Sequence, residues 1–345
     1  MRTLTELVCP HILKMQAYSS ARSEFKGKAS VFLDANENAI RTTYNRYPDP
    51  LQVNLKQAIQ PLLEVQPEQI FLGNGSDEAI DLLLRIFCVS RQDAIITLPP
   101  TYGMYKVSAS LNHIETIEIP LEADYQPNVA AILAAQNERT KILFICSPNN
   151  PTGNDFELKK IEALIQGFNG IVVVDEAYIH FSTQASCIKW IDKYQNLVVL
   201  QTFSKAWGMA GIRLGMAMAN PKVIQLFNKV KPPYNVNVLT QEYALSQLQD
   251  LTVFEQDIAR ILAQRKDLAA QLSTLKFVEK IYPSAANFLL IKVDQANLIY
   301  QYLVEQGIII RNRSTVLLCA NCLRITVGTK EENRILMDCL KGYLV

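Results

Sequence analysis

The chain has 345 residues, a hydrophobic share of 49% and a near-neutral charge, with 34 lysines and arginines against 33 acidic residues. This balance provides no general electrostatic attraction to nucleic acid or to an anionic membrane, and every apolar run is shorter than the ~20 residues of a membrane-spanning helix. The N-terminus lacks the apolar core of a signal peptide, so we expect a cytoplasmic protein without a membrane or nucleic-acid partner.

The seven cysteines are scattered along the chain, and several lie in apolar runs, which is typical of reduced, buried thiols. Cys319 and Cys322 form the only CxxC pair, and neither a second cysteine pair nor a histidine pair accompanies them. Because a structural zinc ion is almost always held by four such ligands, we expect no metal site.

Residues 1–45 show little regular pattern, and we expect an arm that packs on the small domain and the active site. From about residue 69, β-rich runs alternate with amphipathic helical patterns, which is typical of an α/β domain around a mostly parallel sheet. The first helix of this pattern follows Gly75, with Ser76 as its expected N-cap. The predicted strands of this large domain, which we place at 46–262, are 69–73, 93–98, 141–147, 170–175, 196–202 and 212–218.

The pattern changes after Pro232 and Pro233 to long helical stretches over about 239–275. A capping box of Thr329 and Glu332 precedes a last amphipathic helix. We therefore expect a small α+β domain at 263–345, with strands at 287–292, 307–311 and 322–327.

The exit of the first predicted strand has the character of a phosphate site. In open α/β sheets, ligands bind beyond the carboxyl ends of the strands, and a glycine turn that leads into a helix exposes N–H groups to an anion. The sequence there is GNGSDE, over 73–78, and Glu78 stands where a dinucleotide motif has its third glycine. A tight structural turn, a mononucleotide-like phosphate site and a dinucleotide site all remain open from these residues.

Chemically distinctive side chains follow the other predicted strands. Taken alone, each has an ordinary explanation: packing at the core rim for Tyr102, a turn for Asn150, a turn cap for Asp175 and a solvated surface for Lys205. A buried aspartate can keep a pyridine nitrogen protonated, and a partly desolvated lysine can act as a nucleophile. Together, the phosphate turn, the aromatic ring, the amide, the acid and the lysine match the needs of pyridoxal 5'-phosphate.

The chain resembles the fold type I pyridoxal-phosphate aminotransferases along nearly its whole length. The segment SKAWGMAGIR, at 204–213, is specific to this broad class, and three further segments resemble its histidinol-phosphate branch. Those three are ANEN at 35–38, GNGSDE at 73–78 and LRITVGT at 323–329. The implied architecture is a large domain with a mostly parallel sheet between helices, followed by a smaller α+β domain.

The resemblance implies that Lys205 holds the cofactor covalently and that Asp175 pairs with its ring nitrogen. It also implies that Asn150 and Tyr178 hydrogen-bond the ring oxygen and that Tyr102 stacks on the ring. One contact to the cofactor phosphate would come from a second subunit, which implies a homodimer with shared active sites. The residues implied for this phosphate are Gly75, Ser76, Asp77, Ser204, Arg213 and, from the second subunit, Tyr47.

The implied reaction is a ping-pong transamination between L-histidinol phosphate and 2-oxoglutarate, which gives imidazole acetol phosphate and glutamate in histidine biosynthesis. Arg324 lies within a predicted strand, and a guanidinium in that rigid place can bind a phosphate or a carboxylate. The residues implied for the substrate are Tyr18, Asn36, Arg311 and Arg324. Ala39-Ile40-Arg41 follow ANEN where the family usually has proline and soon glycine.

Four other functions compete with this interpretation. An aromatic amino-acid aminotransferase, or a decarboxylase of a phosphorylated amino acid, would use the same framework on another substrate. A non-catalytic ligand-binding regulator would need to have lost the lysine or gained a nucleic-acid-binding segment, and Lys205 is present. A nicotinamide dehydrogenase is disfavoured by Glu78.

Overall fold

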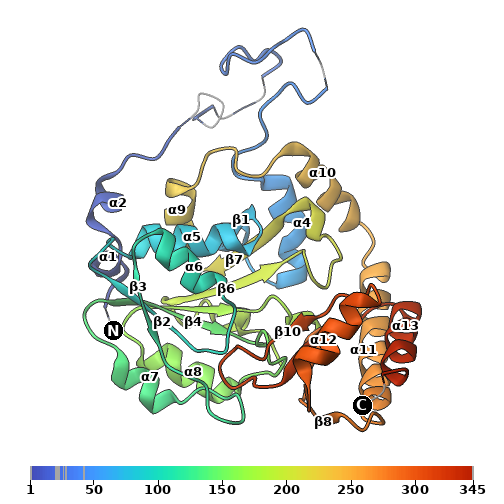
Figure 1. Ribbon diagram of the computed structural model, residues 1–345. Helices are drawn as coiled ribbons and strands as arrows, with labels where there is room; N and C mark the ends of the chain where they lie inside the picture. Colours follow the sequence, from blue (N-terminus) through green and yellow to red (C-terminus); the bar gives the residue numbers. More distant parts are fainter. Residues whose placement is uncertain (1, 20–23, 26, 28, 42, 344–345) are drawn as a thin grey trace.

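The computed structural model describes residues 2–19, 24–25, 27, 29–41 and 43–343. They form two sheets, each with its own hydrophobic core, and Figure 1 shows the smaller sheet and its helices at one side of the larger one. Parts of the expected arm at 1–45 lie outside the described residues. Among those that are described, no helix has the length and apolar character to cross a membrane, and no three His, Cys, Asp or Glu side chains gather into a metal site.

The larger sheet has seven strands in the order β1-β7-β6-β5-β4-β2-β3, and only β7 runs against the others. The six predicted strands are confirmed to within two residues at each end. The sequence analysis missed β3, because this edge strand is half exposed and carries glutamate at both ends. The strands are β1 (Ile70–Asn74), β2 (Ala94–Thr97), β3 (Glu115–Glu118), β4 (Thr140–Cys146), β5 (Ile171–Asp175), β6 (Leu197–Thr202) and β7 (Leu214–Ala219).

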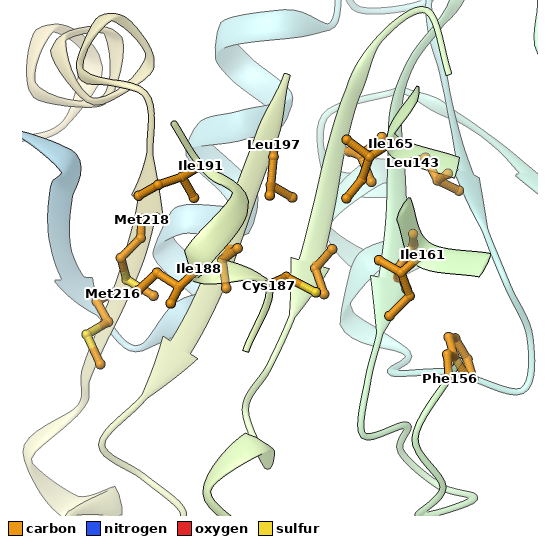
Figure 2. Packing of buried hydrophobic residues seen from close by; sticks show 14 of the residues in the cluster. Leu143, Phe156, Ile161, Ile165, Cys187, Ile188, Ile191, Leu197, Met216 and Met218 are labelled. Atoms are coloured by element: carbon orange, nitrogen blue, oxygen red, sulfur yellow. The ribbon is translucent and has the colours of Figure 1, made fainter. Parts of the chain in front are cut away.

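Helices cover both faces of this sheet, which explains why its central strands are apolar without alternation. Along β5, Val173 packs into one core, whereas Val172 and Val174 pack into the other. Figure 2 shows part of the second core, where Ile161 and Ile165 lie against the strands. The first face is covered by α5 (Ser76–Phe87), α6 (Met104–Leu111) and α9 (Pro221–Val230), and the second by α4 (Val53–Leu63), α7 (Val129–Ala135), α8 (Leu158–Gly167) and η3 (Cys187–Trp190).

The smaller sheet is antiparallel, in the order β10-β11-β9-β8. The predicted strands at 287–292 and 322–327 are confirmed, and the capping box is formed, with Thr329 N–H donating to Glu332 at 2.7 Å. The predicted strand at 307–311 is wrong in extent, since only Arg311 of that range lies in a strand. The sequence analysis missed β8, because half of this strand faces solvent. The elements are α10 (Val238–Gln247), α11 (Thr252–Leu272), β8 (Val278–Ile281), β9 (Phe288–Val293), α12 (Ala296–Glu305), β10 (Arg311–Asn312), β11 (Cys322–Thr326) and α13 (Lys330–Lys341).

The described N-terminal residues divide into a packed part and an exposed part. Helices α1 (Leu4–Leu7) and α2 (Pro10–Lys14) pack on the large domain, with Leu7 and Ile12 in the same core as α5 and α9. These two helices therefore pack on the large domain and not on the small domain, where we expected the arm. Further along, Val31, Leu33 and Ile40 are strongly exposed, and Figure 1 shows residues 29–41 reaching away from the body of the molecule.

Candidate active site

A cavity of about 740 Å³ opens where the carboxyl ends of the large sheet face the small domain. Most residues expected at the site line this cavity: Gly75, Ser76, Asp77, Tyr102, Asn150, Asp175, Tyr178, Ser204, Lys205, Arg213, Arg311 and Arg324. In this single chain, the described lining does not include Tyr18, Asn36 or Tyr47. The fold thus brings the expected cofactor residues of one chain together, along with two of the arginines expected to bind substrate.

The turn between β1 and α5 forms an anion cradle. Gly75 has φ 73° and is the N-cap of α5, so the expectation that Ser76 caps the helix is wrong: Ser76 is its first residue. A positive φ favours glycine, which explains why the turn is made one residue earlier. The backbones pack so closely that a Cβ added to Gly215 of β7 would lie 2.2 Å from the Ser76 nitrogen. Free N–H groups at this helix start, with Arg213 beside them, favour a bound phosphate.

Two side chains tie the cradle to its neighbours. Asp77 accepts a hydrogen bond from the Tyr102 hydroxyl at 3.1 Å and lies 3.7 Å from the Arg213 guanidinium. Glu78 accepts from the Asn74 N–H at 2.5 Å and from the Asn235 amide at 3.2 Å. Glu78 therefore holds the turn between β1 and α5 in place through these hydrogen bonds. This is a structural reason for a glutamate at the position where a dinucleotide site would carry glycine.

Asp175 ends β5 and is 2% exposed at the floor of the cavity. Burial raises its pKa to about 6, while hydrogen bonds from the Tyr105 hydroxyl and the Ala177 N–H act in the opposite direction. The distance from the Tyr105 oxygen to Asp175 Oδ2 is 2.6 Å. A carboxylate held in this way can pair with a cationic ring nitrogen.

Lys205 lies in the turn that follows β6, the strand next to β5, which ends at Asp175. Its amine lies 5.6 Å from the centre of the Tyr178 ring. Partial desolvation and the nearby Arg324 guanidinium lower the pKa of Lys205, although Asp175 and Asp77 oppose them. A lysine with a lowered pKa has more free amine near neutral pH and is a better nucleophile there.

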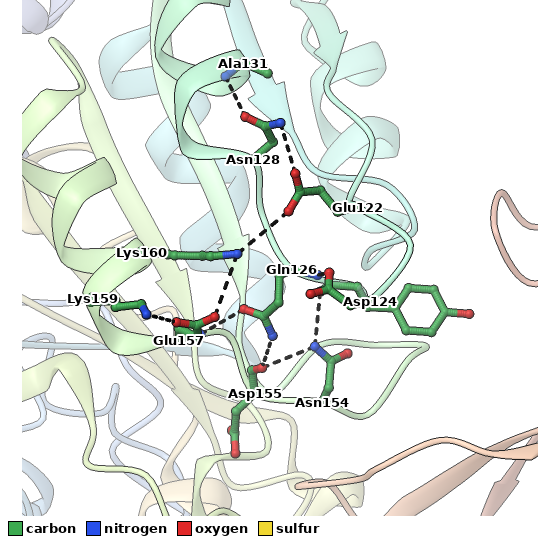
Figure 3. A network of polar contacts seen from close by, with 11 residues as sticks. Glu122, Asp124, Gln126, Asn128, Ala131, Asn154, Asp155, Glu157, Lys159 and Lys160 are labelled. Carbon is green, nitrogen blue, oxygen red and sulfur yellow. Dashed lines mark hydrogen bonds and ion pairs between the residues drawn. The ribbon is translucent and has the colours of Figure 1, made fainter.

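Asn150 joins the two domains across the cavity. Its amide donates to the Tyr178 hydroxyl at 3.5 Å, and its Oδ1 accepts a short hydrogen bond from Arg324 on β11. The Arg324 guanidinium also lies 5.2 Å above the Phe288 ring. In the Asn150 loop, the Asn149 N–H donates to the Asn154 carbonyl at 2.9 Å. Figure 3 shows the polar network around Asn154, which fixes this loop against the segment before α7.

A third arginine of the small domain, Arg313, lines the cavity and was missed in the sequence analysis. Its Nε is buried and has no hydrogen-bond partner among the described residues. Burial lowers the pKa of Arg313 and of Arg324. The positive charge of Arg311 lowers both pKa values further, and Arg313 also lowers that of Arg324. The signal that could have found Arg313 is its place two residues after Arg311, because alternate residues of an extended chain share a face.

The three expected residues outside the cavity lie in the N-terminal segment. Tyr18 is 68% exposed and Asn36 is exposed with φ 53°. Tyr47 is half exposed and stacks on Tyr234, with 4.5 Å between the ring centres. Their expected roles stay predictions.

The sequence relatives cover almost the whole chain. Residues 20–340 match the family model for aminotransferase class I and II. A histidinol-phosphate aminotransferase of Flavobacterium johnsoniae is 53% identical over 334 residues, which cover 96% of each chain. A histidinol-phosphate aminotransferase of Bacteroides thetaiotaomicron is 50% identical over 344 residues, which cover 99% of each chain.

Solved structures share the fold. A histidinol-phosphate aminotransferase from Sinorhizobium meliloti, in complex with pyridoxal-5'-phosphate, matches 89% of each chain with a TM-score of 0.79 at 22% identity. The enzyme of the same name from Clostridium acetobutylicum matches 87% of this chain and 90% of its own, with a TM-score of 0.80 at 23% identity. With the family match and the closer sequence relatives, these likenesses lead to one conclusion: the chain belongs to the class I and II aminotransferases.

Proposed function

We propose that this protein uses pyridoxal 5'-phosphate to transfer the amino group of L-histidinol phosphate to 2-oxoglutarate, a step of histidine biosynthesis. The observation that carries the proposal is the pair of Lys205 and Asp175 at the ends of adjacent strands, beside an anion cradle in one cavity. The substrate is the one in the names of the relatives that are about 50% identical over nearly the full chain.

The residues of the cavity fit this cofactor. The cradle of Gly75, Ser76 and Asp77 presents backbone N–H groups to a phosphate, and a side chain on Gly215 would disrupt it. Ser204 and Arg213 would complete the phosphate site, and Tyr102 would stack on the ring. Asp175 would pair with the ring nitrogen, Asn150 and Tyr178 would hydrogen-bond the ring oxygen, and Lys205 would hold the cofactor covalently. Bound pyridoxal phosphate supplies an electron sink that stabilises negative charge at the substrate's Cα.

Lys205 is the proposed acid and base of the reaction. Its amine, when free, would take the proton from the substrate's Cα and deliver it to the C4' carbon of the cofactor. Its lowered pKa supports this role, because the neutral amine is then more available near neutral pH. Asp175 would keep the ring nitrogen protonated throughout.

The small domain supplies the proposed anion contacts of the substrate. Arg324 and Arg311 would bind the phosphate of L-histidinol phosphate in one half-reaction and a carboxylate of glutamate or 2-oxoglutarate in the other, since a guanidinium binds either anion through two parallel hydrogen bonds. Tyr18 and Asn36 would approach the substrate from the N-terminal segment.

The proposal also includes an assembly and a location. We propose a homodimer in which Tyr47 of each chain reaches the cofactor phosphate of the other, because Tyr47 is half exposed and lies outside its own cavity. The ligands are small molecules, and a cytoplasmic location agrees with seven cysteines that form no disulfide.

The test is the absorbance of the purified protein between about 300 and 500 nm, where the two forms of the cofactor differ. We expect a yellow protein that L-histidinol phosphate bleaches and 2-oxoglutarate restores. Initial rates with phenylalanine and phosphothreonine would reveal an aromatic aminotransferase or a phospho-amino-acid decarboxylase instead. A colourless protein that pyridoxal phosphate cannot reconstitute would contradict the cofactor assignment.

A further inference from the structure

Within the part of the chain that the structure describes, the side-chain carboxylate of Asp175 accepts two hydrogen bonds, one at each oxygen. Oδ1 accepts from the Ala177 N–H at 3.1 Å, and Oδ2 accepts from the Tyr105 hydroxyl at 2.6 Å. The first donor is backbone and is present whatever the side chain of residue 177. Tyr105 is therefore the side chain through which the sequence controls the charge and orientation of this carboxylate.

Tyr105 is held rigidly for this contact. Its side chain is completely buried in the first turn of α6. The ring stacks on Phe144 with 4.6 Å between centres and 10° between planes, and Tyr102 meets it edge-on at 5.5 Å. One short turn after β2 thus places two tyrosines: Tyr102 lines the cavity, and Tyr105 lies behind it against Asp175.

The direction of this hydrogen bond follows from the two groups. Burial is the main cause that raises the pKa of the Tyr105 phenol well above its usual range, so the phenol keeps its proton and is the donor. The same burial raises the pKa of Asp175 to about 6, and the Tyr105 hydrogen bond is the largest influence that lowers it. Without that donor, Asp175 would be more protonated at neutral pH and less able to attract a positive ring nitrogen.

We propose that Tyr105 is a positioning residue for the ring-nitrogen site: its hydroxyl keeps Asp175 ionised and oriented, and so sets how strongly the cofactor ring is bound. This inference rests on the proposed function, because it assumes a pyridine nitrogen at Asp175. The titratable and charged groups that face Asp175 are Tyr105 from α6, Cys146 from β4, Asp77 from α5, Tyr178 after β5, Lys205 after β6 and Tyr102 before α6.

Two probes isolate the ring nitrogen from the rest of the cofactor. One is pyridoxal phosphate, and the other is the same molecule with a carbon in place of the ring nitrogen. Both carry the phosphate, the hydroxyl and the aldehyde, and the intrinsic difference between the two probes is the same for the wild type and for each variant, so it cancels when variants are compared. The ratio of their dissociation constants for the apoprotein, measured from pH 5 to pH 8.5, reports the contact between Asp175 and the nitrogen.

The test compares Tyr105→Phe, which removes one oxygen, with the wild type. For the wild type, we expect the preference for pyridoxal phosphate to increase as pH rises through about 6, where Asp175 ionises. In Tyr105→Phe, we expect this midpoint to move upward by about one pH unit, the size expected for one hydrogen bond to a charged group. Because the preference follows the ionised fraction of Asp175, it should then fall about tenfold at pH 5 and about twofold at pH 7.

Tyr194→Phe is the matched control, because the Tyr194 hydroxyl also donates to a carboxylate, Glu162, at 2.7 Å, outside the cavity lining. It should leave both the midpoint and the preference unchanged. Equal weakening of both probes in Tyr105→Phe, or an unmoved midpoint, would overturn the role of Tyr105 alone. A wild-type apoprotein that binds neither probe would overturn the proposed function, and this inference with it.

Discussion

At the scale of single residues, the cavity gathers cationic side chains from both domains. Arg311, Arg313 and Arg324 come from the small domain, and Lys205 comes from the large one. Burial lowers the pKa values of Arg313, Arg324 and Lys205, and neighbouring arginines lower them further, because these cations repel one another. Such a group is stabilised by a bound anion, so a substrate with a phosphate or a carboxylate would relieve the repulsion.

Arg324→Lys tests whether the shape of the guanidinium matters as well as its charge. Lysine keeps the charge but has no planar fork, and it cannot donate to Asn150 and to a phosphate through parallel bonds. We expect the KM for L-histidinol phosphate to rise about tenfold or more, with a smaller change in kcat. Steady-state kinetics measure both. Arg334→Lys, on the exposed face of α13, is the control, and an equal KM for the two variants would exclude a specific role of Arg324.

At the scale of elements, the cofactor site depends on how closely β7 approaches the start of α5. Gly215→Ala would place a methyl group 2.2 Å from the Ser76 nitrogen and 2.4 Å from the Gly75 carbonyl carbon. Because these are backbone atoms, the cradle must move, and overpacking of this kind costs about 1–3 kcal/mol of stability.

For Gly215→Ala, we therefore expect the affinity for pyridoxal phosphate to fall at least about tenfold, together with a lower melting temperature. Titration of the apoprotein and thermal unfolding measure the two effects. Gly211→Ala is the control, since no heavy atom lies within 4 Å of a Cβ at that position. Equal binding by both variants would show that the cradle tolerates displacement.

The elements that could be predicted from the sequence are those whose pattern has a single physical cause. The central strands are buried on both faces, so their apolar runs are unbroken, and the residues at their ends led to Asp175 and Lys205. The strands β3 and β8 are half exposed, and their mixed composition resembles that of a loop. Tyr105 was missed because a buried tyrosine in an amphipathic helix has the same pattern whether it fills a core or holds a carboxylate.

At the scale of the whole molecule, helix α11 spans the two domains that form the cavity. Ile258 and Ile261, in its first half, pack near Tyr178 and Phe288, whereas Leu268 and Leu272 belong to the core of the small domain. We propose that the domains divide within this helix, at 262 and 263. The large domain then supplies the residues proposed to bind the cofactor, and the small domain supplies the arginines proposed to bind the substrate. The hydrogen bond between Arg324 and Asn150 connects the two domains across the cavity.

The end of the N-terminal segment, at Pro50, is held by hydrogen bonds to the large domain, although residues before it are exposed. The Lys231 amine donates to the Pro50 carbonyl at 2.6 Å and to Asn235 Oδ1 at 3.0 Å. Asn235 in turn donates to Glu78, which braces the cofactor cradle. Tyr47, three residues before Pro50, is therefore held at a defined place on the surface, and a side chain presented in this way can serve a neighbouring copy of the chain.

Co-expression of two impaired variants tests this shared site. Lys205→Ala removes the proposed catalytic amine, and Tyr47→Ala weakens the cofactor phosphate site of the partner chain. In a mixed dimer, one site combines Lys205 of one chain with Tyr47 of the other and is intact. Random pairing should therefore restore about a quarter of the wild-type sites at limiting pyridoxal phosphate. Activity equal to the average of the two separate variants would mean that each chain completes its own site, because a symmetric dimer without exchange has no intact combination to recover.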